Sequence, residues 1–139
     1  MKVLIDNNIV IDAIKPNPDF EKNGKKVFTL IRQGVIEPYI VSSSLTDIFY
    51  ILRKVQGSND AKTTLKNLIT VFNTISLEEK DCIEALNLPN NDYDDSVISI
   101  CAKKADVDYI VSRDEDFINS VSSIKVILPR TLFERLKNS

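Results

Sequence analysis

Short apolar runs alternate with amphipathic stretches along the chain, and this alternation predicts the secondary structure. Buried strands are predicted for the apolar runs at 2–5, 35–41, 75–77, 108–111 and 124–128. Apolar residues spaced three and four apart predict helices at 9–14, 19–32, 42–56, 78–86, 94–105 and 130–136, and one more marked by Leu65, Leu68, Ile69 and Phe72. Strands that alternate with helices predict an α/β fold with a mostly parallel sheet.

Residues that start or stop elements support these boundaries. Pro16 is expected to stop the first helix, and Gly34 suits the position just after the end of the second. Ser42–Ser44 offer N-caps for the third helix, the sequence at 57–60 predicts a loop, and Pro89–Asp92 is typical of a turn.

Composition restricts the chemistry of the chain. Of 139 residues, 43% are apolar and 27% charged, so we expect residues 1–139 to form a single globular domain. The chain contains no histidine, which excludes Ser-His-Asp and Cys-His catalysis and histidine-bound zinc. Thirteen aspartates and seven glutamates are left to carry acid–base or metal chemistry.

The sequence also predicts a cytoplasmic protein. Two cysteines, Cys82 and Cys101, are too few for a disulfide scaffold and suit a reducing compartment, and both are expected to fill core space. No apolar run reaches the roughly 18 residues of a membrane span, and no basic segment followed by a long apolar stretch predicts a secretion signal. The net charge of −2 gives no basic field, although bound divalent cations would reverse the sign locally.

Aspartates stand where the predicted strands end. Four segments carry them: Asp6, Asp47, the group Asp92, Asp94 and Asp95, and Asp114. Asp6 and Asp114 directly follow strands, whereas the others lie near the starts of helices. Because the carboxyl ends of the strands form the ligand crevice of an open α/β sheet, all four segments can converge there.

A cluster of carboxylates needs a counter-charge, because like charges raise one another's pKa. Hard divalent cations such as Mg²⁺ or Mn²⁺ supply that charge, prefer oxygen ligands and support phosphodiester hydrolysis. The alternative is that each aspartate is a turn or N-cap residue, as aspartates at such positions often are. Asp47 differs, because it lies in an apolar helix and must reach solvent or a metal.

At this point the motifs resemble those of PIN-domain nucleases. VLIDNNIVID at 3–12 resembles the family's opening motif, and SSLTDIFYILRK at 43–54 resembles the second. NDYDDSVISICAKKADVDYIVSRDEDF at 91–117 resembles the third and fourth motifs together. The four motifs occur in the expected order and span most of the chain.

The resemblance implies a three-layer α/β/α sandwich that cleaves RNA with Mg²⁺ or Mn²⁺. Carried over by position, the catalytic and metal-binding acids are Asp6, Asp47, Asp95 and Asp114, with Asp116 as a further metal-binding acid. The supporting residues are Asn7 beside the first acid, the outer acid Asp92, the hydroxyl of Ser112, and Arg113, which could meet phosphate or pair with an acid. The chain departs from the family at Asp47, where glutamate is more common; the shorter side chain must bring the ion closer or reach it through water.

The resemblance also implies partners. Many small bacterial PIN proteins, the VapC-like ribonucleases, are toxins that dimerise and are silenced by an antitoxin inserted into the active-site groove. We therefore expect an RNA substrate, a homodimer and an antitoxin partner. The apolar Phe49–Ile51 stretch exceeds what one core face needs, which agrees with dimerisation.

Other functions compete with this interpretation. A non-catalytic PIN-like domain would keep the fold and use the groove for protein or RNA contacts. A haloacid-dehalogenase phosphatase needs a second aspartate two residues after the first, where this chain has Asn8, and a receiver domain needs a late lysine where it has Ser112-Arg113. Basic clusters at 22–32 and 53–66 could contact RNA phosphates or form solvated helix surface.

Overall fold

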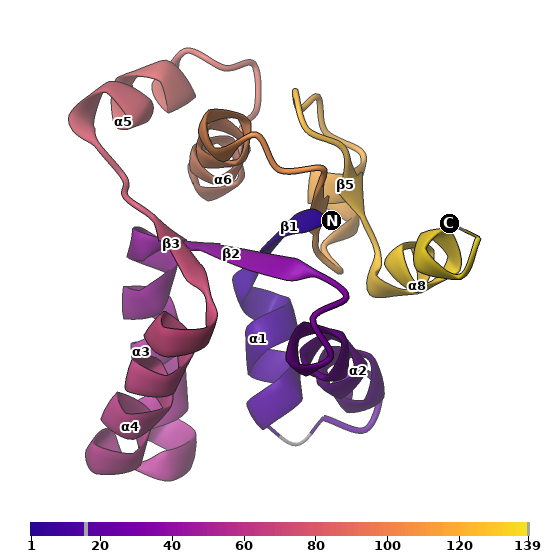
Figure 1. The fold of residues 1–139 in the computed structure, drawn as a ribbon. Helices are drawn as coiled ribbons and strands as arrows, with labels where there is room; N and C mark the ends of the chain where they lie inside the picture. Colours follow the sequence, from indigo (N-terminus) through magenta and orange to yellow (C-terminus); the bar gives the residue numbers. More distant parts are fainter. Residues whose placement is uncertain (16, 139) are drawn as a thin grey trace.

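The computed structural model describes residues 1–15 and 17–138, which form three layers with a central sheet (Figure 1). The predicted helix stop at Pro16 lies outside the described residues. The sheet has five parallel strands in the order β3-β2-β1-β4-β5. The strands are β1 (Lys2–Ile5), β2 (Glu37–Val41), β3 (Asn73–Ile75), β4 (Tyr109–Val111) and β5 (Val126–Ile127). The predicted α/β fold with a parallel sheet is confirmed.

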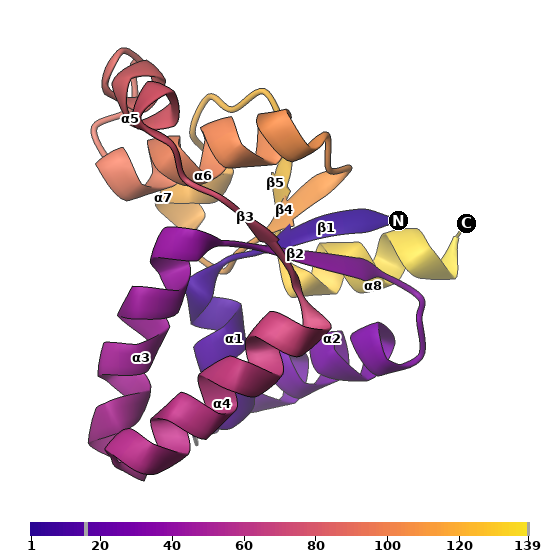
Figure 2. The same ribbon diagram turned by 60° about the vertical axis from the view of Figure 1, so that its left-hand side comes forward.

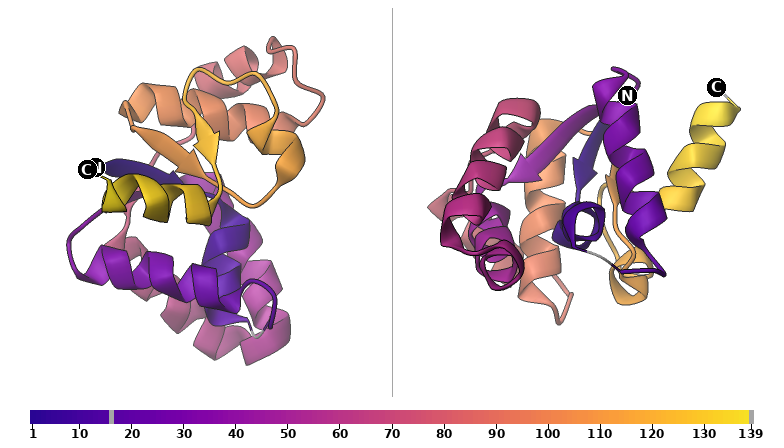
Figure 3. Two further views of the ribbon diagram at one scale, coloured as in Figure 1. Left: turned by 90° about the vertical axis from the view of Figure 1, so that its right-hand side faces the viewer. Right: turned by 90° about the horizontal axis from the view of Figure 1, so that it is seen from below.

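Helices cover both faces of the sheet (Figures 1 and 2). One face carries α1 (Asn7–Ile14), α2 (Glu21–Arg32), α3 (Ser42–Gln56), α4 (Ser58–Val71) and α8 (Pro129–Lys137). The other face carries α5 (Glu79–Leu86), α6 (Tyr93–Ala105) and α7 (Glu115–Ile118). The C-terminal helix α8 lies alongside α2 (Figure 3), where Lys26 Nζ lies 4.3 Å from the centre of the Phe133 ring.

Strand β1 connects the two hydrophobic cores. Val3 and Ile5 pack into the core under α1 to α4, whereas Leu4 between them packs into the core under α5 to α7. This is the alternation that a strand requires, since successive side chains point to opposite faces. Because both faces are covered, β1 is apolar throughout its buried length, as strands of parallel sheets are.

The structure differs from the sequence prediction at several element boundaries. The strand expected at 75–77 is Asn73–Ile75, and α7 was not predicted. The expected loop at 57–60 shrinks to Gly57, whose φ of 87° a side chain would disfavour, because α4 already begins at Ser58. Ser42–Ser44 form the first turn of α3, so Val41 is the N-cap residue. Gly34 has a φ of 72° and follows α2 as predicted.

The two cysteines have different environments. Cys101 on α6 is buried in the core, as predicted, and this burial raises the pKa of its thiol to about 11. Cys82 on α5 is only half-buried, so the prediction that it fills core space is wrong, and the neighbouring apolar residues Ile83 and Leu86 are exposed. Across residues 1–15 and 17–138, no helix is both long enough and apolar enough to cross a bilayer.

An ion pair holds α5 against α6. Lys104 Nζ lies 2.5 Å from Asp81 Oδ2 and donates a second hydrogen bond to the carbonyl of Ser76, at 2.6 Å. The Asp81 carboxylate also accepts the backbone N–H of Glu78. The hydrogen bond from Lys104 holds the pKa of Asp81 below its ordinary value. The contact fixes α6, whose N-terminal end faces the site described below.

Close packing of α1 against α2 depends on the absence of a side chain at Gly24. A Cβ there would lie 2.7 Å from the backbone nitrogen of Ala13 and 3.0 Å from the carbonyl carbon of Asp12. Since both are backbone atoms, one helix would have to move. We expect Gly24→Ala to destabilise the protein by about 1–3 kcal/mol, although alanine favours helices.

This prediction can be checked by urea denaturation, with Asn23→Ala at the exposed neighbouring position as the control. The control should leave the midpoint unchanged or raise it slightly. A Gly24→Ala midpoint raised as much as that of the control would show that the two helices are not packed this closely.

Candidate active site

The strand order reverses between β1 and β4, and the loops that follow these two strands meet there. Asp6 follows β1 directly, and its backbone N–H donates to the carbonyl of Val111 at the end of β4, at 2.9 Å. Ser112, Arg113 and Asp114 come next after β4. Open α/β sheets bind their ligands at such reversal points, so Asp6 and Asp114 lie where the topology predicts a site.

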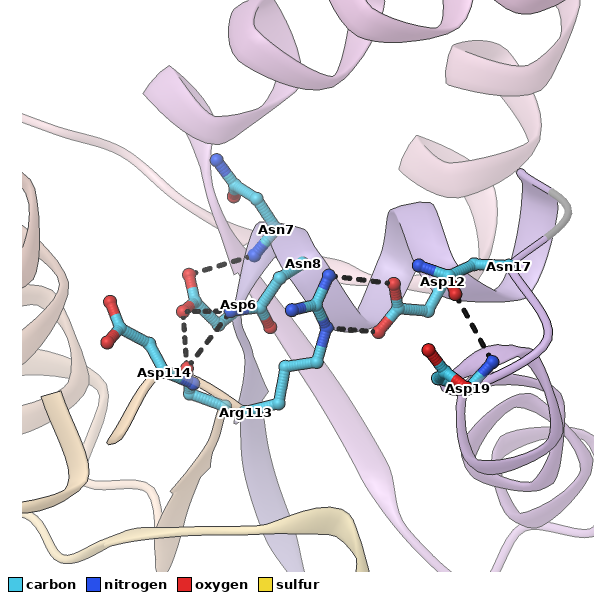
Figure 4. A network of polar contacts seen from close by, with 9 residues as sticks. Asp6, Asn7, Asn8, Asp12, Asn17, Asp19, Arg113 and Asp114 are labelled. Carbon is cyan, nitrogen blue, oxygen red and sulfur yellow. Dashed lines mark hydrogen bonds and ion pairs between the residues drawn. The ribbon is translucent and has the colours of Figure 1, made fainter. Parts of the chain in front are cut away.

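The hydroxyl of Ser112 organises this corner. It is fully buried and donates to Asp6 Oδ2 at 2.7 Å. It accepts a hydrogen bond from Asn8 Nδ2 at 3.3 Å and another from the backbone N–H of Asp114 at 3.1 Å. The other oxygen of Asp6 accepts the backbone N–H of Asn7 at 2.9 Å (Figure 4). Asp6 is therefore held in one orientation from both loops.

Three of the predicted site acids also cap helices. Asp6 caps α1, Asp92 caps α6 by accepting the N–H of Asp95 at 3.1 Å, and Asp114 caps α7 by accepting the N–H of Asp116 at 3.0 Å. The positive ends of these helix dipoles therefore face the acids and offset part of their mutual repulsion. From sequence alone, helix capping and metal binding are alternative roles for these aspartates. In the structure the same side chains cap helices and lie at the candidate site.

A groove of about 620 Å³ runs past these acids. Its acidic lining residues are Asp6, Asp47, Asp92, Asp94, Asp95 and Asp114. Asp47 is exposed into this groove, so its position in an apolar helix leaves no buried unpaired charge. Asp116 lies elsewhere: it lines a neighbouring cavity of about 450 Å³, which shares Asp92 and Asp95 with the groove.

The carboxylates repel one another, and burial strengthens the effect. Asp95 is 7% exposed, and burial, followed by the charges of Asp92, Asp114 and Asp6, raises the pKa of its carboxyl to about 7. Burial also raises the pKa of Asp6, although its hydrogen bonds to Ser112 and Asn7 act in the opposite direction.

Asp47 interacts mainly with the outer part of the cluster. The pKa of Asp94 is raised first by burial and then by the charges of Asp47 and Asp92. We call Asp6, Asp95 and Asp114 the inner group. The charge of the helix cap Asp92 acts on Asp6, Asp94 and Asp95, and the charge of Asp47 acts on Asp94.

The donor set fits a hydrated divalent cation. Within the described residues, no three acidic or cysteine side chains converge closely enough to enclose an ion. Magnesium does not need such a cage, because it keeps several waters and binds one or two carboxylates. The oxygens Asn7 Oδ1 and Asn8 Oδ1 are buried without a hydrogen-bond partner among those residues, so they are further unused acceptors beside Asp6. The repelling acids and the unused amide oxygens together favour a cation.

Two residues at this site escaped the sequence analysis. The amide of Asn8, rather than that of Asn7, contacts Asp6 and Ser112; the doubled asparagine was the only available signal. Asp12 is buried and forms a two-point ion pair with Arg113, with Nε at 2.7 Å and Nη2 at 3.2 Å from its carboxylate oxygens. A lone aspartate within the apolar run of α1 was the signal for a buried ion pair.

Several solved structures share this fold over most of their length. A toxin–antitoxin complex from Klebsiella pneumoniae contains a chain with 16% identity and a TM-score of 0.67, with 91% of this chain and 97% of that chain covered. A chain of VapBC2 from Rickettsia felis, bound to a DNA fragment from its promoter, has 16% identity and a TM-score of 0.64, with 92% of this chain and 98% of that chain covered. VapC20 from Mycobacterium tuberculosis, a toxin that cleaves the sarcin–ricin loop, has 12% identity and a TM-score of 0.66, with 83% of this chain and 92% of that chain covered. At these identities the likeness establishes the fold.

The family itself is established from the sequence. A comparison with curated proteins finds no match. The family model described as the PIN domain matches residues 2–116, which include every acid of the groove and extend to Asp116 of the neighbouring cavity. With this match and the shared fold, the chain belongs to the PIN-domain family.

Proposed function

We propose that this protein is a metal-dependent endoribonuclease that uses Mg²⁺ or Mn²⁺ to hydrolyse RNA phosphodiester bonds. The observation that carries the proposal is the inner group of acids, Asp6, Asp95 and Asp114, gathered at the strand-order reversal in an open groove. A bound cation stabilises a cluster of carboxylates whose pKa values are raised. Without a cation to bind, replacing such acids with neutral residues would relieve their repulsion and stabilise the fold.

The acids have different proposed roles. Asp6, Asp95 and Asp114 would hold the ion, directly or through water, with Ser112 keeping Asp6 in orientation. Asp47 faces the same groove and would complete the site from α3. When bound, the cation supplies a Lewis acid that activates water for attack on phosphorus and stabilises the leaving oxygen. Asp116, which lines the neighbouring cavity, would support the site from its other side.

RNA is the substrate that we propose. Lys15 and Lys54 line the groove together with the acids and would contact the phosphates on either side of the cleaved bond. The structurally similar VapC20 is described as a toxin that cleaves the sarcin–ricin loop, which supports RNA rather than another phosphodiester.

We propose that the protein partner is an antitoxin and that the two proteins meet in the cytoplasm. Several structural relatives are toxin–antitoxin complexes. The groove has an apolar side formed by Ile11, Ile51 and Val55, of which Ile51 and Val55 are notably exposed. An extended or helical partner segment could cover these apolar residues while it blocks access to the acids.

A metal-binding experiment tests the nuclease proposal. Mn²⁺ at a hundredfold excess over its dissociation constant should raise the stability of the wild-type protein by about 2.7 kcal/mol. Asp6→Asn should lose this gain and the cleavage of RNA, whereas Asp60→Asn, an exposed change on α4, should keep both. Thermal melts and a gel assay with single-stranded RNA measure the two effects. Cleavage that continues in EDTA would overturn metal dependence.

The raised pKa of Asp95 predicts an unusual pH dependence. Between its ordinary value of 3.8 and about 7, the native state keeps a proton that the unfolded chain has lost. The metal-free protein should therefore lose stability as the pH rises through this window, and Asp95→Asn should reduce that loss to the part due to Asp6 and Asp94. The ion must displace the proton, so stabilisation by Mn²⁺ should grow over the same window.

Urea unfolding of the metal-free protein at several values between about pH 4 and pH 8 measures this effect. Asp60→Asn serves as the control and should follow the wild-type curve. If the stabilities of Asp95→Asn and the wild-type protein show equal slopes against pH, Asp95 does not keep a proton in the native state over this window.

The dimer that we propose would use the exposed apolar surface of α3. Tyr50 is 53% exposed, and its ring packs edge-on against Phe49 at 5.5 Å and beneath Arg53. We expect light scattering to give twice the chain mass of 15.7 kDa for the wild-type protein and for Ile83→Glu on the opposite side of the sheet. Tyr50→Glu should shift the protein to the monomer, because a charge would be buried in the interface. A monomeric wild-type protein would end the dimer proposal.

A further inference from the structure

Arg113 is the cation nearest the acidic cluster in sequence, directly before Asp114, yet it does not pair with any acid of the groove. Within the described residues, its ion pair is with Asp12 on α1. The Asp12 side chain is only 4% exposed and that of Arg113 is 34% exposed, so a buried anion holds a cation at the rim. A buried carboxylate requires such a partner, because it has lost its hydration.

The contacts around the guanidinium fix its orientation as well as its position. Nε and Nη2 each donate to one oxygen of Asp12, which is the two-point geometry that arginine and carboxylate favour. The guanidinium carbon lies 4.0 Å from the centre of the Phe20 ring, next to the start of α2. The close approach at Gly24 keeps α2 near Asp12, so α1 and the start of α2 together hold the guanidinium of Arg113.

One edge of the guanidinium remains available. Nη1 donates no hydrogen bond among the described residues and is directed away from Asp12, on the side of Asp6 and Asn8 in Figure 4. Arg113 lines the same groove as Asp6, Asp95 and Asp114. A charged donor is therefore presented beside the place where RNA phosphate would lie, and guanidinium is well suited to phosphate oxygens.

We propose that Asp12 is a positioning residue that keeps Arg113 out of the acidic cluster and directs Nη1 to a phosphate oxygen of the bound RNA. The inference rests on the proposed ribonuclease function, which it deepens. Without Asp12, the guanidinium would be drawn to Asp6 and Asp114, where it would occupy the place of a cation and lose its contact with RNA.

The experiment measures binding of a short single-stranded oligoribonucleotide in an Asp6→Asn background, which prevents cleavage. Adding the pair of changes Asp12→Asn and Arg113→Gln removes both charges together, so neither is left buried alone. The slope of log affinity against log salt should fall by about one phosphate contact. Lys103→Gln, which removes an exposed charge in the last turn of α6, at the end of that helix away from the groove, should leave the slope unchanged. An unchanged slope in the double variant would overturn the phosphate contact.

Asp12→Asn alone separates positioning from a purely structural role. With native Asp6, it should reduce both the stabilisation by Mn²⁺ and kcat/KM, the latter by about 10- to 100-fold, because the freed Arg113 competes at the acids. Arg113→Lys should keep the Mn²⁺ effect, because an ammonium group can still pair with Asp12, but should lose cleavage, because lysine has no second guanidinium edge for phosphate. A destabilised Asp12→Asn protein with a wild-type Mn²⁺ shift and wild-type kcat/KM would show that Asp12 only supports the fold. If the wild-type protein cleaves no RNA, the proposed function fails, whereas the salt slope still decides the role of Arg113.

Discussion

Repulsion among carboxylates at one edge of the sheet is the constraint that the surrounding structure has to meet. Asp6 and Asp95 are both buried, burial raises the pKa of each, and the charge of Asp114 raises both pKa values further. A fold can hold such a group only if other contacts fix the backbone that carries it. The reversal between β1 and β4 does so, because two loops with well-packed strands behind them meet there.

Hydrogen bonds from several helices and loops stabilise these repelling carboxylates. The helices α1, α6 and α7 all begin at the cluster and each is capped by one of its acids. The hydroxyl of Ser112 connects the two loops through bonds to Asp6, Asn8 and the backbone of Asp114. The same carboxylates therefore start helices and face the groove, so a cap role does not argue against a ligand role. Arg113, the nearest cation in sequence, is kept from neutralising the cluster by its pair with Asp12.

The sequence predicted the parts of this arrangement that depend on periodicity and on strand ends. Asp6 and Asp114 could be placed because each follows a short apolar strand, and the parallel sheet brings such ends together. Asp12 carries a local signal, a lone aspartate in an apolar run, but its partner could not be identified, because Arg113 lies 101 positions away and no local pattern links the two. Likewise, Asp116 was expected as a further metal-binding acid, but it lies within α7, two residues after the N-cap Asp114, and lines another cavity. The missed start of α4 followed from treating Gly57 to Asp60 as a loop, where one glycine with positive φ suffices.

The pairing of β1 with β4 has a consequence for folding. The bond between Ser112 and Asp6 joins residues 106 positions apart, so the acidic corner closes only after most of the chain is available. Contacts this distant in sequence form slowly, because a long loop must be closed first. During synthesis, the segment up to β3 can fold as strands and helices while Asp6 still lacks Ser112, Asp95 and Asp114. On the ribosome, the acidic corner therefore cannot assemble before Ser112 and Asp114 have been synthesised, although Asp6 is among the first residues made.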